Sequence, residues 1–361
     1  MGKASTPTVS AVDLFCGAGG LTRGLIAAGV KVVAGIDIDP DAEHAYTANN
    51  GGAKYLQWDV SRKQAKTVAA LFPKGGVRLL AGCAPCQPFS NLTNGIKRHE
   101  AWDLLTYFGK LVERIRPELV TMENVPELAR RGREVFDEFK ASLERAGYKY
   151  DWRIVNCADY GVPQQRRRLV LLASRLGPIK VPRGRLRKAS QWVTVSKAIG
   201  DLPPVRSGEV HPKDRLHLSA KLSDLNLRRI RATAHDGGGR EGWPEELLLE
   251  CHKRETGGRY TSIYGRMAWD SPAPTMTTLC HNLGSGRFGH PEQDRAISLR
   301  EASLLQGFPR DYSFWPEKSK TNRSAVARLI GNAVPPPLAE ALGGTLVRHA
   351  RKHKPKARSS K

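Results

Sequence analysis

The sequence lacks the features that mark membrane and secreted proteins. No apolar run approaches the ~18 residues that indicate a membrane-spanning helix. The first ten residues, MGKASTPTVS, contain no apolar signal core. Six cysteines in 361 residues do not resemble a disulfide framework. We therefore expect a protein of a reducing cytoplasm, with no membrane partner.

The cysteines also offer little for a metal. Cys83 and Cys86 form one C-x-x-C pair, whereas a structural zinc site needs about four ligands and no second pair is present. We therefore expect no metal. A redox dithiol and a plain buried cysteine remain open for this pair. Burial would account for Cys83, but it does not explain why Pro85 and Pro88 flank Cys86. Two prolines stiffen a loop, and a stiff loop suits a cysteine that acts as a nucleophile.

Acidic residues are scarce relative to basic ones. The chain has 58 Lys and Arg against 35 Asp and Glu, a formal net charge of +23. Such a surplus favours a polyanionic partner, most simply nucleic acid, although it could also serve solubility. Clustering favours nucleic acid, and the densest stretches are 130–133, 164–168, 182–188 and 227–231. Residues 351–361 are expected to form a disordered basic tail.

Alternating strand and helix patterns predict the fold class. Apolar strands are expected at 9–15, 30–37, 77–82, 118–125 and 167–174. Helical spacing follows the first strand and recurs at 104–115, 298–309 and 335–350. This alternation predicts an α/β fold with a parallel, doubly wound, Rossmann-like sheet.

Composition changes divide the chain into domains. After about residue 182 the regular alternation is lost, while Pro, Gly, Arg and His rise. We expect a first domain over 1–185 that is completed by 326–350. A smaller, loop-rich domain is expected over 186–298, followed by a hinge at 299–325. No internal repeat is visible.

The stretch DLFCGAGG (13–20) combines a strand end, a glycine turn and a helix start. Glycines at such a turn let a ligand approach the amides of a helix N-terminus. Asp37 ends the next strand about 20 residues on, where a carboxylate can take ribose hydroxyls. The dinucleotide template would require glycine where Thr22 stands. The loop predicts an adenosine-bearing ligand and leaves open which one.

Three polar features follow strand ends: Asp37, the PCQPFS loop (85–90) and Glu123. In a doubly wound sheet, ligands bind beyond the carboxyl ends of the strands. A right-handed crossover through 104–115 would set the strands before Cys86 and Glu123 side by side. Neighbouring strands lie ~4.8 Å apart, so a thiol and a carboxyl could share one substrate.

Eight motifs in order resemble those of the bacterial-type DNA (cytosine-5) methyltransferases, and the resemblance covers nearly the whole chain. They are DLFCGAGG (13–20), ID (36–37), WDV (58–60), PCQPFS (85–90), ENV (123–125), PQQRRR (163–168), LREASLLQGFP (299–309) and GNAVPPPLA (331–339). Together they are far more specific than any one motif.

The resemblance implies the catalytic roles. Cys86 would attack carbon 6 of cytosine, which makes carbon 5 nucleophilic. Glu123 would hydrogen-bond ring nitrogen 3 and the exocyclic amine. Arg166 would hold the base carbonyl, and Arg168 would support the loop or a phosphate. Because the target carbon is buried in duplex DNA, the base would be flipped out of the stack, and residues 91–102 would close over the DNA as a lid.

The resemblance also implies the binding residues. The methyl donor would be S-adenosylmethionine, held by Phe15, Gly17, Gly19, Asp37, Ile38, Asp59, Val60, Pro85, Asn332 and Val334. Double-stranded DNA would be contacted by Ser90, Gln164, Arg228, Arg229 and Arg231. Residues 186–298 would form the target-recognition domain. We expect a monomer in the bacterial cytoplasm, associated with the nucleoid. The sequence leaves open whether a restriction endonuclease is a functional partner.

Two alternatives remain. Related enzymes methylate cytosine in tRNA with the same catalytic motifs, but they typically carry two prolines before the catalytic cysteine, where Ala84 and Pro85 stand here. A non-catalytic DNA-binding module is the other alternative. The presence of Cys86, Glu123 and Arg166 argues against it.

Overall fold

The computed structural model describes residues 8–85, 100–253, 262–317, 319 and 322–353. The chain forms two compact units. The first comprises Met1–Tyr160, Arg167–Gly184 and Val334–Lys361, and the second comprises Gly161–Arg166 and Arg185–Ala333. The chain thus leaves the first unit for the second after Gly184, close to the domain boundary expected at residue 185. The second unit extends to Ala333, whereas we expected the first domain to resume at residue 326.

The first unit contains a seven-stranded sheet with the order β3-β2-β1-β4-β5-β7-β6. Its strands are β1 (Val9–Leu14), β2 (Lys31–Asp37), β3 (Lys54–Gln57), β4 (Val77–Gly82), β5 (Leu119–Asn124), β6 (Lys149–Asn156) and β7 (Arg167–Ser174). Strands β1 to β5 run parallel. Their carboxyl ends therefore meet at one edge of the sheet, which we call the carboxyl edge. The pairing of β4 with β5 confirms the expected neighbourhood of the strands before Cys86 and Glu123.

One part of the sheet differs from the fully parallel arrangement that we predicted. Strand β7 runs antiparallel to both β5 and β6. Only residues 157–166 connect β6 to β7, too few for the crossover of a dozen or more residues that a parallel pair needs. Strand β6 was not predicted, because as an edge strand it is only half-buried and carries Lys149, Asp151 and Arg153. Strand β3, also at an edge, was missed for the same reason.

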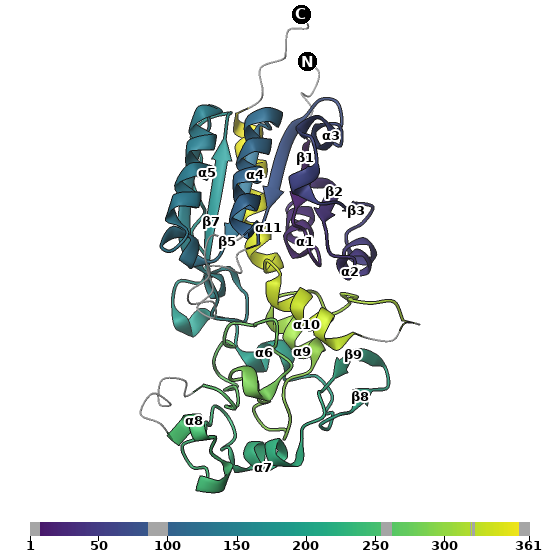
Figure 1. Ribbon diagram of the computed structural model, residues 1–361, viewed down its shortest axis with the longest axis vertical. Helices are drawn as coiled ribbons and strands as arrows, with labels where there is room; N and C mark the ends of the chain where they lie inside the picture. The colour runs from purple at the N-terminus through teal and green to yellow at the C-terminus, as the bar shows by residue number, and fades with distance from the viewer. Residues whose placement is uncertain (1–7, 86–99, 254–261, 318, 320–321, 354–361) are drawn as a thin grey trace, which may run out of the picture. The chain divides into compact units, whose positions relative to one another are not determined.

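Helices cover both faces of this sheet. They are α1 (Gly20–Ala27), α2 (Ala42–Asn49), α3 (Ala65–Ala69), α4 (Glu100–Ile115), α5 (Arg133–Arg145) and α11 (Pro336–Lys352). Figure 1 shows α4 and α5 in front of the sheet and α11 behind it. Side chains alternate between the two faces of a strand, so Val12 and Leu14 join the core with Phe108 and Phe139 of α4 and α5. The opposite face of β1 carries Asp13.

Two glycines allow α11 to pack closely against α1. A Cβ atom on Gly24 would lie 2.3 Å from the carbonyl oxygen of Pro336. A Cβ atom on Gly343 would lie 2.8 Å from the Cβ atom of Ala28. Both distances are shorter than real Cβ contacts, so larger residues would push the helices apart. The last helix of the chain is in this way tied to the first.

The second unit has few regular elements. Its helices are α6 (Val195–Ile199), α7 (Asp224–Ala232), α8 (Glu250–Lys253), α9 (Leu299–Leu305) and α10 (Arg323–Asn332), and its strands are β8 (Val210–His211) and β9 (Asp214–Leu218). Turns and loops join these short elements, as the composition after residue 182 predicted. A capping box begins α9, because the Ser298 hydroxyl accepts from the Glu301 amide and the Glu301 carboxylate accepts from the Ser298 amide. In the described part of the chain, no helix is long and apolar enough to cross a membrane.

Candidate active site

Glu123 lies at the carboxyl end of β5 and is only 3% exposed. Its Oε1 atom lies 2.9 Å from Nε of Arg168. Its Oε2 atom accepts a hydrogen bond of 2.8 Å from Sγ of Cys83. Because β7 is antiparallel to β5, Arg168 near the start of β7 reaches the end of β5. A buried carboxylate is thus held from two neighbouring strands.

The loop toward Cys86 is anchored beside Glu123. It leaves β4, where the Cys83 amide donates to the carbonyl of Leu14 at 3.3 Å. Asn124, directly after Glu123, donates from Nδ2 to the carbonyl of Ala84 at 3.2 Å. Pro85 follows and is exposed. The expected nucleophile Cys86 and the expected DNA contact Ser90 lie outside the described residues.

The glycine loop after β1 adopts a backbone that suits ligand binding. Phe15, Gly17 and Gly19 have positive φ angles of 57°, 48° and 87°. The Gly17 amide donates to Oδ2 of Asp37 at 2.8 Å, so the loop and the end of β2 are joined. Burial raises the pKa of Asp37, although the amides of Gly17 and Asp39 oppose this effect. Around Gly17 nothing lies within 4 Å of where a Cβ atom would be.

Most of the other expected cofactor residues lie at the ends of neighbouring strands. Ile38 follows β2 and is 64% exposed, unusual for a large apolar side chain. Asp59 follows β3 and accepts from the Ser61 amide at 2.9 Å, while Val60 is buried. Because β3, β2 and β1 are adjacent, these residues share the carboxyl edge with the glycine loop.

The two remaining cofactor candidates belong to different units. Asn332 is exposed at the end of α10 in the second unit. Val334 is 4% exposed and opens the last segment of the first unit.

Asp13 is a buried titratable residue next to the glycine loop that the sequence analysis did not single out. It is fully buried in β1, and its Oδ2 accepts a hydrogen bond of 2.7 Å from Thr22. The Thr22 hydroxyl also lies 3.0 Å from the hydroxyl of Tyr46. Burial raises the pKa of Asp13 to about 7. The sequence signal for Asp13 was an acidic residue inside a largely apolar strand, two residues before Phe15 of the glycine loop.

Arg166 and Gln164 lie in the second unit and are buried there. Arg166 donates from Nη1 to the Met276 carbonyl at 2.8 Å and from Nη2 to the Gly331 carbonyl at 2.7 Å. Gln164 is fully buried and bonds Gln306 at 2.7 Å. The contacts therefore distinguish the two arginines: Arg168 pairs with Glu123, whereas Arg166 holds backbone segments of the second unit together.

The three arginines of α7 differ in exposure. Arg228 pairs with Glu246 and Arg231 with Asp294, and both side chains are more than half exposed, at 58% and 66%. Arg229 is 5% exposed and donates from Nε to the Leu247 carbonyl at 2.9 Å. Arg228 and Arg231 are thus exposed to solvent, whereas the side chains of the other two expected DNA contacts, Arg229 and Gln164, are buried and hydrogen-bonded inside the unit.

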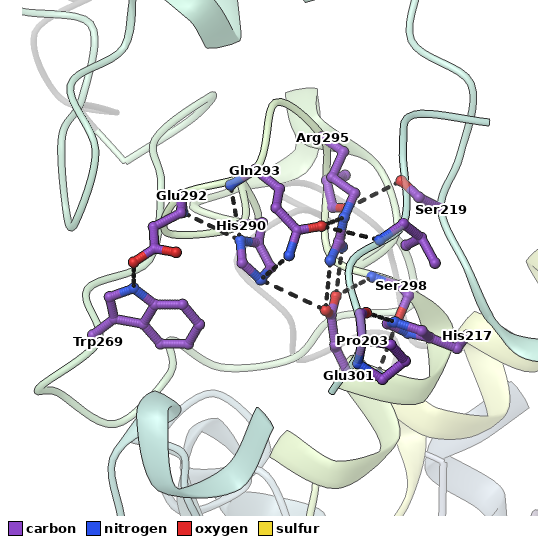
Figure 2. A network of polar contacts seen from close by, with 12 residues as sticks. Pro203, His217, Ser219, Trp269, His290, Glu292, Gln293, Arg295, Ser298 and Glu301 are labelled. Carbon is purple, nitrogen blue, oxygen red and sulfur yellow. Dashed lines mark hydrogen bonds and ion pairs between the residues drawn. The ribbon is translucent and has the colours of Figure 1, made fainter. Parts of the chain in front are cut away.

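A buried polar network supports the LREASLLQGFP segment (Figure 2). Arg295 and Glu301 form a bidentate pair with both N–O distances at 2.7 Å. Burial would raise the pKa of Glu301, but the Arg295 bonds outweigh it and lower that pKa to about 2. Burial lowers the pKa of His290 to about 4. The charged pair and a neutral histidine together hold the start of α9.

In the part of the chain that the structure describes, no group of three or more His, Cys, Asp or Glu residues could hold a metal ion.

Comparison with known proteins identifies the family. Residues 9–348 match the C-5 cytosine-specific DNA methylases. The chain belongs to this family. It is 47% identical over 338 residues to the Type II methylase M.HgiDII of Herpetosiphon aurantiacus, covering 93% of this chain and 94% of that one. It is 30% identical to the Type II methyltransferase M.XorII of Xanthomonas oryzae pv. oryzae, covering 94% and 85%.

Solved structures share the fold of this C-5 cytosine methylase. A protein described as a DNA modification methyltransferase encoded within a prophage (E. coli) superposes with a TM-score of 0.71 at 23% identity, covering 94% of this chain and 99% of that one. The Dnmt2 methyltransferase of S. pombe gives a TM-score of 0.57 at 19% identity, covering 95% and 98%. These likenesses confirm the expected fold class.

The comparisons confirm the main functional prediction. The protein is a DNA (cytosine-5) methyltransferase, and family membership implies S-adenosylmethionine as the methyl donor. The tRNA alternative is not favoured, because the family and the curated relatives that match over most of their length are named as DNA or Type II enzymes. The non-catalytic module is not favoured either.

Proposed function

We propose that the first unit transfers a methyl group to carbon 5 of a flipped-out cytosine in duplex DNA through a covalent Cys86 adduct. The observation that carries this proposal is the buried Glu123 carboxylate, held by Arg168 at 2.9 Å beside the anchored start of the Cys86 loop. A carboxyl group so placed can bond a base only if the base leaves the DNA stack and reaches the carboxyl edge of the sheet. Burial strengthens that bond, because competing water is excluded.

The carboxyl edge fits S-adenosylmethionine. The open space at Gly17 allows the backbone to approach a ligand. Asp37 offers a carboxylate for ribose hydroxyls, and the exposed Ile38 offers an apolar surface for an adenine. Phe15, Gly19, Asp59, Val60, Pro85, Asn332 and Val334 complete the residues that we assign to this ligand. When bound, it supplies an electrophilic methyl group on a sulfonium.

The roles of the chain's own residues follow from cytosine chemistry. Carbon 5 is a poor nucleophile until the Cys86 thiolate adds to carbon 6. Protonated Glu123 donates a hydrogen bond to nitrogen 3 and accepts one from the exocyclic amine, so its proton offsets the negative charge that thiolate addition places on the ring. We assign the base carbonyl to Arg168 in place of Arg166, because Arg168 is the arginine bonded to Glu123. After methyl transfer, loss of the carbon 5 proton expels Cys86.

We assign target recognition to the second unit. It contains none of the residues to which we give chemistry, and its exposed Arg228 and Arg231 suit phosphate or guanine contacts. The relatives named as Type II methylases support a pairing with a restriction endonuclease. We propose that the enzyme acts as a monomer on DNA in the bacterial cytoplasm.

The decisive experiment combines a covalent trap with a variant. A duplex with 5-fluorocytosine at the target should form a stable complex with the wild-type protein in the presence of the methyl donor. Cys86→Ala should lose this complex and all detectable turnover while it still binds DNA. Cys251→Ala, a substitution of an exposed cysteine, serves as the matched control and should behave as wild type. Turnover by the Cys86→Ala variant would contradict the mechanism.

The recognition sequence can be read directly. Expression in a host without cytosine methylation, followed by bisulfite sequencing, should reveal one short motif that is methylated at one cytosine. Replacing residues 185–333 by the corresponding segment of a relative should transfer the relative's motif. An active chimera with the original motif would show that recognition lies elsewhere.

A further inference from the structure

Cys83 is fixed next to Glu123 by two hydrogen bonds to the backbone, one at its own amide and one at the next residue. Its amide donates to the Leu14 carbonyl, and the carbonyl of the next residue, Ala84, accepts from Asn124. Gly82 pairs with Met122 in the parallel register of β4 and β5, so Cys83 and Glu123 are the next residues along two adjacent strands. The thiol is therefore held opposite the carboxylate by the sheet itself.

The Cys83 thiol completes the surroundings of the Glu123 carboxylate. Sγ donates to Oε2 at 2.8 Å, while Nε of Arg168 lies 2.9 Å from Oε1. A carboxylate has about four lone-pair directions, so each oxygen keeps one for a base after these two bonds. With one donor on each oxygen, the plane of the carboxylate is fixed. A fixed plane matters, because ring nitrogen 3, which accepts, and the adjacent exocyclic amine, which donates, must be bonded by the two carboxyl oxygens at once.

The neighbouring carboxylate decides which role the thiol can take. A thiolate beside a buried carboxylate would place two negative charges within hydrogen-bond distance, which is unfavourable at low dielectric. The neutral thiol is a donor, and a bond from a donor to a charged acceptor is stronger than one between neutral groups. This environment suits a hydrogen-bond donor and not a nucleophile.

We propose that Cys83 is a positioning residue for the methyl transfer: its thiol, together with Arg168, orients the Glu123 carboxylate toward the flipped cytosine. This inference rests on the role proposed above for Glu123. The positioning role explains the C-x-x-C pair of Cys83 and Cys86 without a metal site or a redox dithiol. The first cysteine orients the carboxylate, and the second attacks the base.

The test compares variants that keep or remove the donor. Cys83→Ala should lower kcat on the order of tenfold, as expected for the loss of one hydrogen bond to a charged group, with little change in the KM for S-adenosylmethionine. Cys83→Ser retains a donor and should restore kcat to within about threefold of wild type. Cys251→Ala again serves as the control, and the melting temperature of each variant reports folding.

The outcomes separate this inference from the proposed function. If wild type and Cys251→Ala methylate DNA while Cys83→Ala is folded and equally fast, the positioning role is overturned. If Cys83→Ala fails to fold, Cys83→Gly removes the same donor and takes its place, and wild-type turnover by that variant overturns the role as well. Failure of the wild-type protein to methylate any cytosine would instead overturn the proposed function.

Discussion

The two units differ in the charges that they bury. Among the described residues, every buried arginine belongs to the second unit: Arg166, Arg229, Arg266 and Arg295. The first unit buries the acids Asp13 and Glu123, both toward the carboxyl ends of strands. The second unit also buries one acid, Glu301, but in a pair with the buried Arg295. Buried arginines therefore occur where the structure is irregular, and buried acids without a buried arginine partner occur at the carboxyl edge of the sheet.

The arginines of the second unit act as structural cross-links. Arg266 is fully buried and donates to the carbonyls of Thr233, His290, Gln293 and Ile230 at 2.7–3.1 Å, and to Asp294 at 2.5 Å. Loops lack the ladder bonds of a sheet, so their buried carbonyls need other donors. One guanidinium offers five donors in a rigid fork. Arginine therefore replaces part of the hydrogen bonding that regular elements provide elsewhere.

The buried acids of the first unit have fewer partners. The Oδ1 atom of Asp13 is buried with no hydrogen-bond partner among the described residues. Glu123 has Arg168 and Cys83, which leave lone pairs free. Parallel strands already satisfy the backbone here, so these acids are not needed to complete the fold. Buried titratable groups of this kind cluster at functional sites.

The largest effect should follow from breaking a cross-link of the second unit. Arg266→Met removes the buried hydrogen bonds that the guanidinium donates to four carbonyls and to Asp294, so we expect the free energy of unfolding to fall by about 3–5 kcal/mol. Arg228→Met is the matched control on an exposed arginine and should change it by less than ~0.5 kcal/mol. Urea unfolding of both variants measures the difference. Equal losses of unfolding free energy in the two variants would show that a buried arginine stabilises the unit no more than an exposed one.

A somewhat smaller effect should depend on pH and on Asp13. Its pKa of about 7 in the folded state lies above the ordinary value of 3.8, so the folded chain keeps a proton that the unfolded chain releases. Stability should therefore fall as the pH rises from about 4 to about 7, by at most ~4 kcal/mol. Asp13→Asn removes this titration.

Unfolding at pH 5 and pH 8 tests the Asp13 prediction. Wild type should lose stability between pH 5 and pH 8, whereas Asp13→Asn should not lose it through this group. The free energy of unfolding of the variant, measured relative to wild type, should therefore be higher at pH 8 than at pH 5. Asp103→Asn, on the exposed surface of α4, should follow the wild-type pH dependence. A parallel pH dependence for wild type and Asp13→Asn would mean that Asp13 ionises as readily in the folded chain as in the unfolded one.

The smallest effect concerns exposed arginines at the carboxyl edge. Arg130 and Arg131 follow β5, Arg167 begins β7, and within the described part of the chain the side chains of all three are exposed and make no ion pair. We expect them to contact DNA phosphates. Each substitution to glutamine should weaken DNA binding a few-fold on any sequence and reduce the salt slope of log K by about 1.

Salt titration of DNA affinity provides the measurement and its control. Lys31→Gln removes an equal charge at the opposite end of the sheet, where β2 begins, and should leave the slope unchanged. An unchanged slope for the three arginine variants would exclude phosphate contacts at this edge. A loss confined to one DNA sequence would instead indicate base readout.

The strand positions show how far local pattern predicts the fold. Buried strands such as β1, β4 and β5 were predicted because apolar residues predominate in strands that are buried on both faces. Edge strands β3 and β6 were missed, since half-buried strands carry polar residues on the open side. The direction of β7 was also wrong, because strand direction depends on the length of the connection and not on the composition of the strand.

The sequence by itself determined the family and the methyl-transfer activity, because motif order is a property of the chain alone. Only the tertiary structure decided which polar groups meet. Arg166 and Arg168 stand two residues apart in one motif, yet only the latter bonds Glu123. Arg228 and Arg229 are adjacent, yet only the former is exposed. The availability of a side chain depends on the segments packed around it, which come from distant parts of the chain, and no local pattern records them.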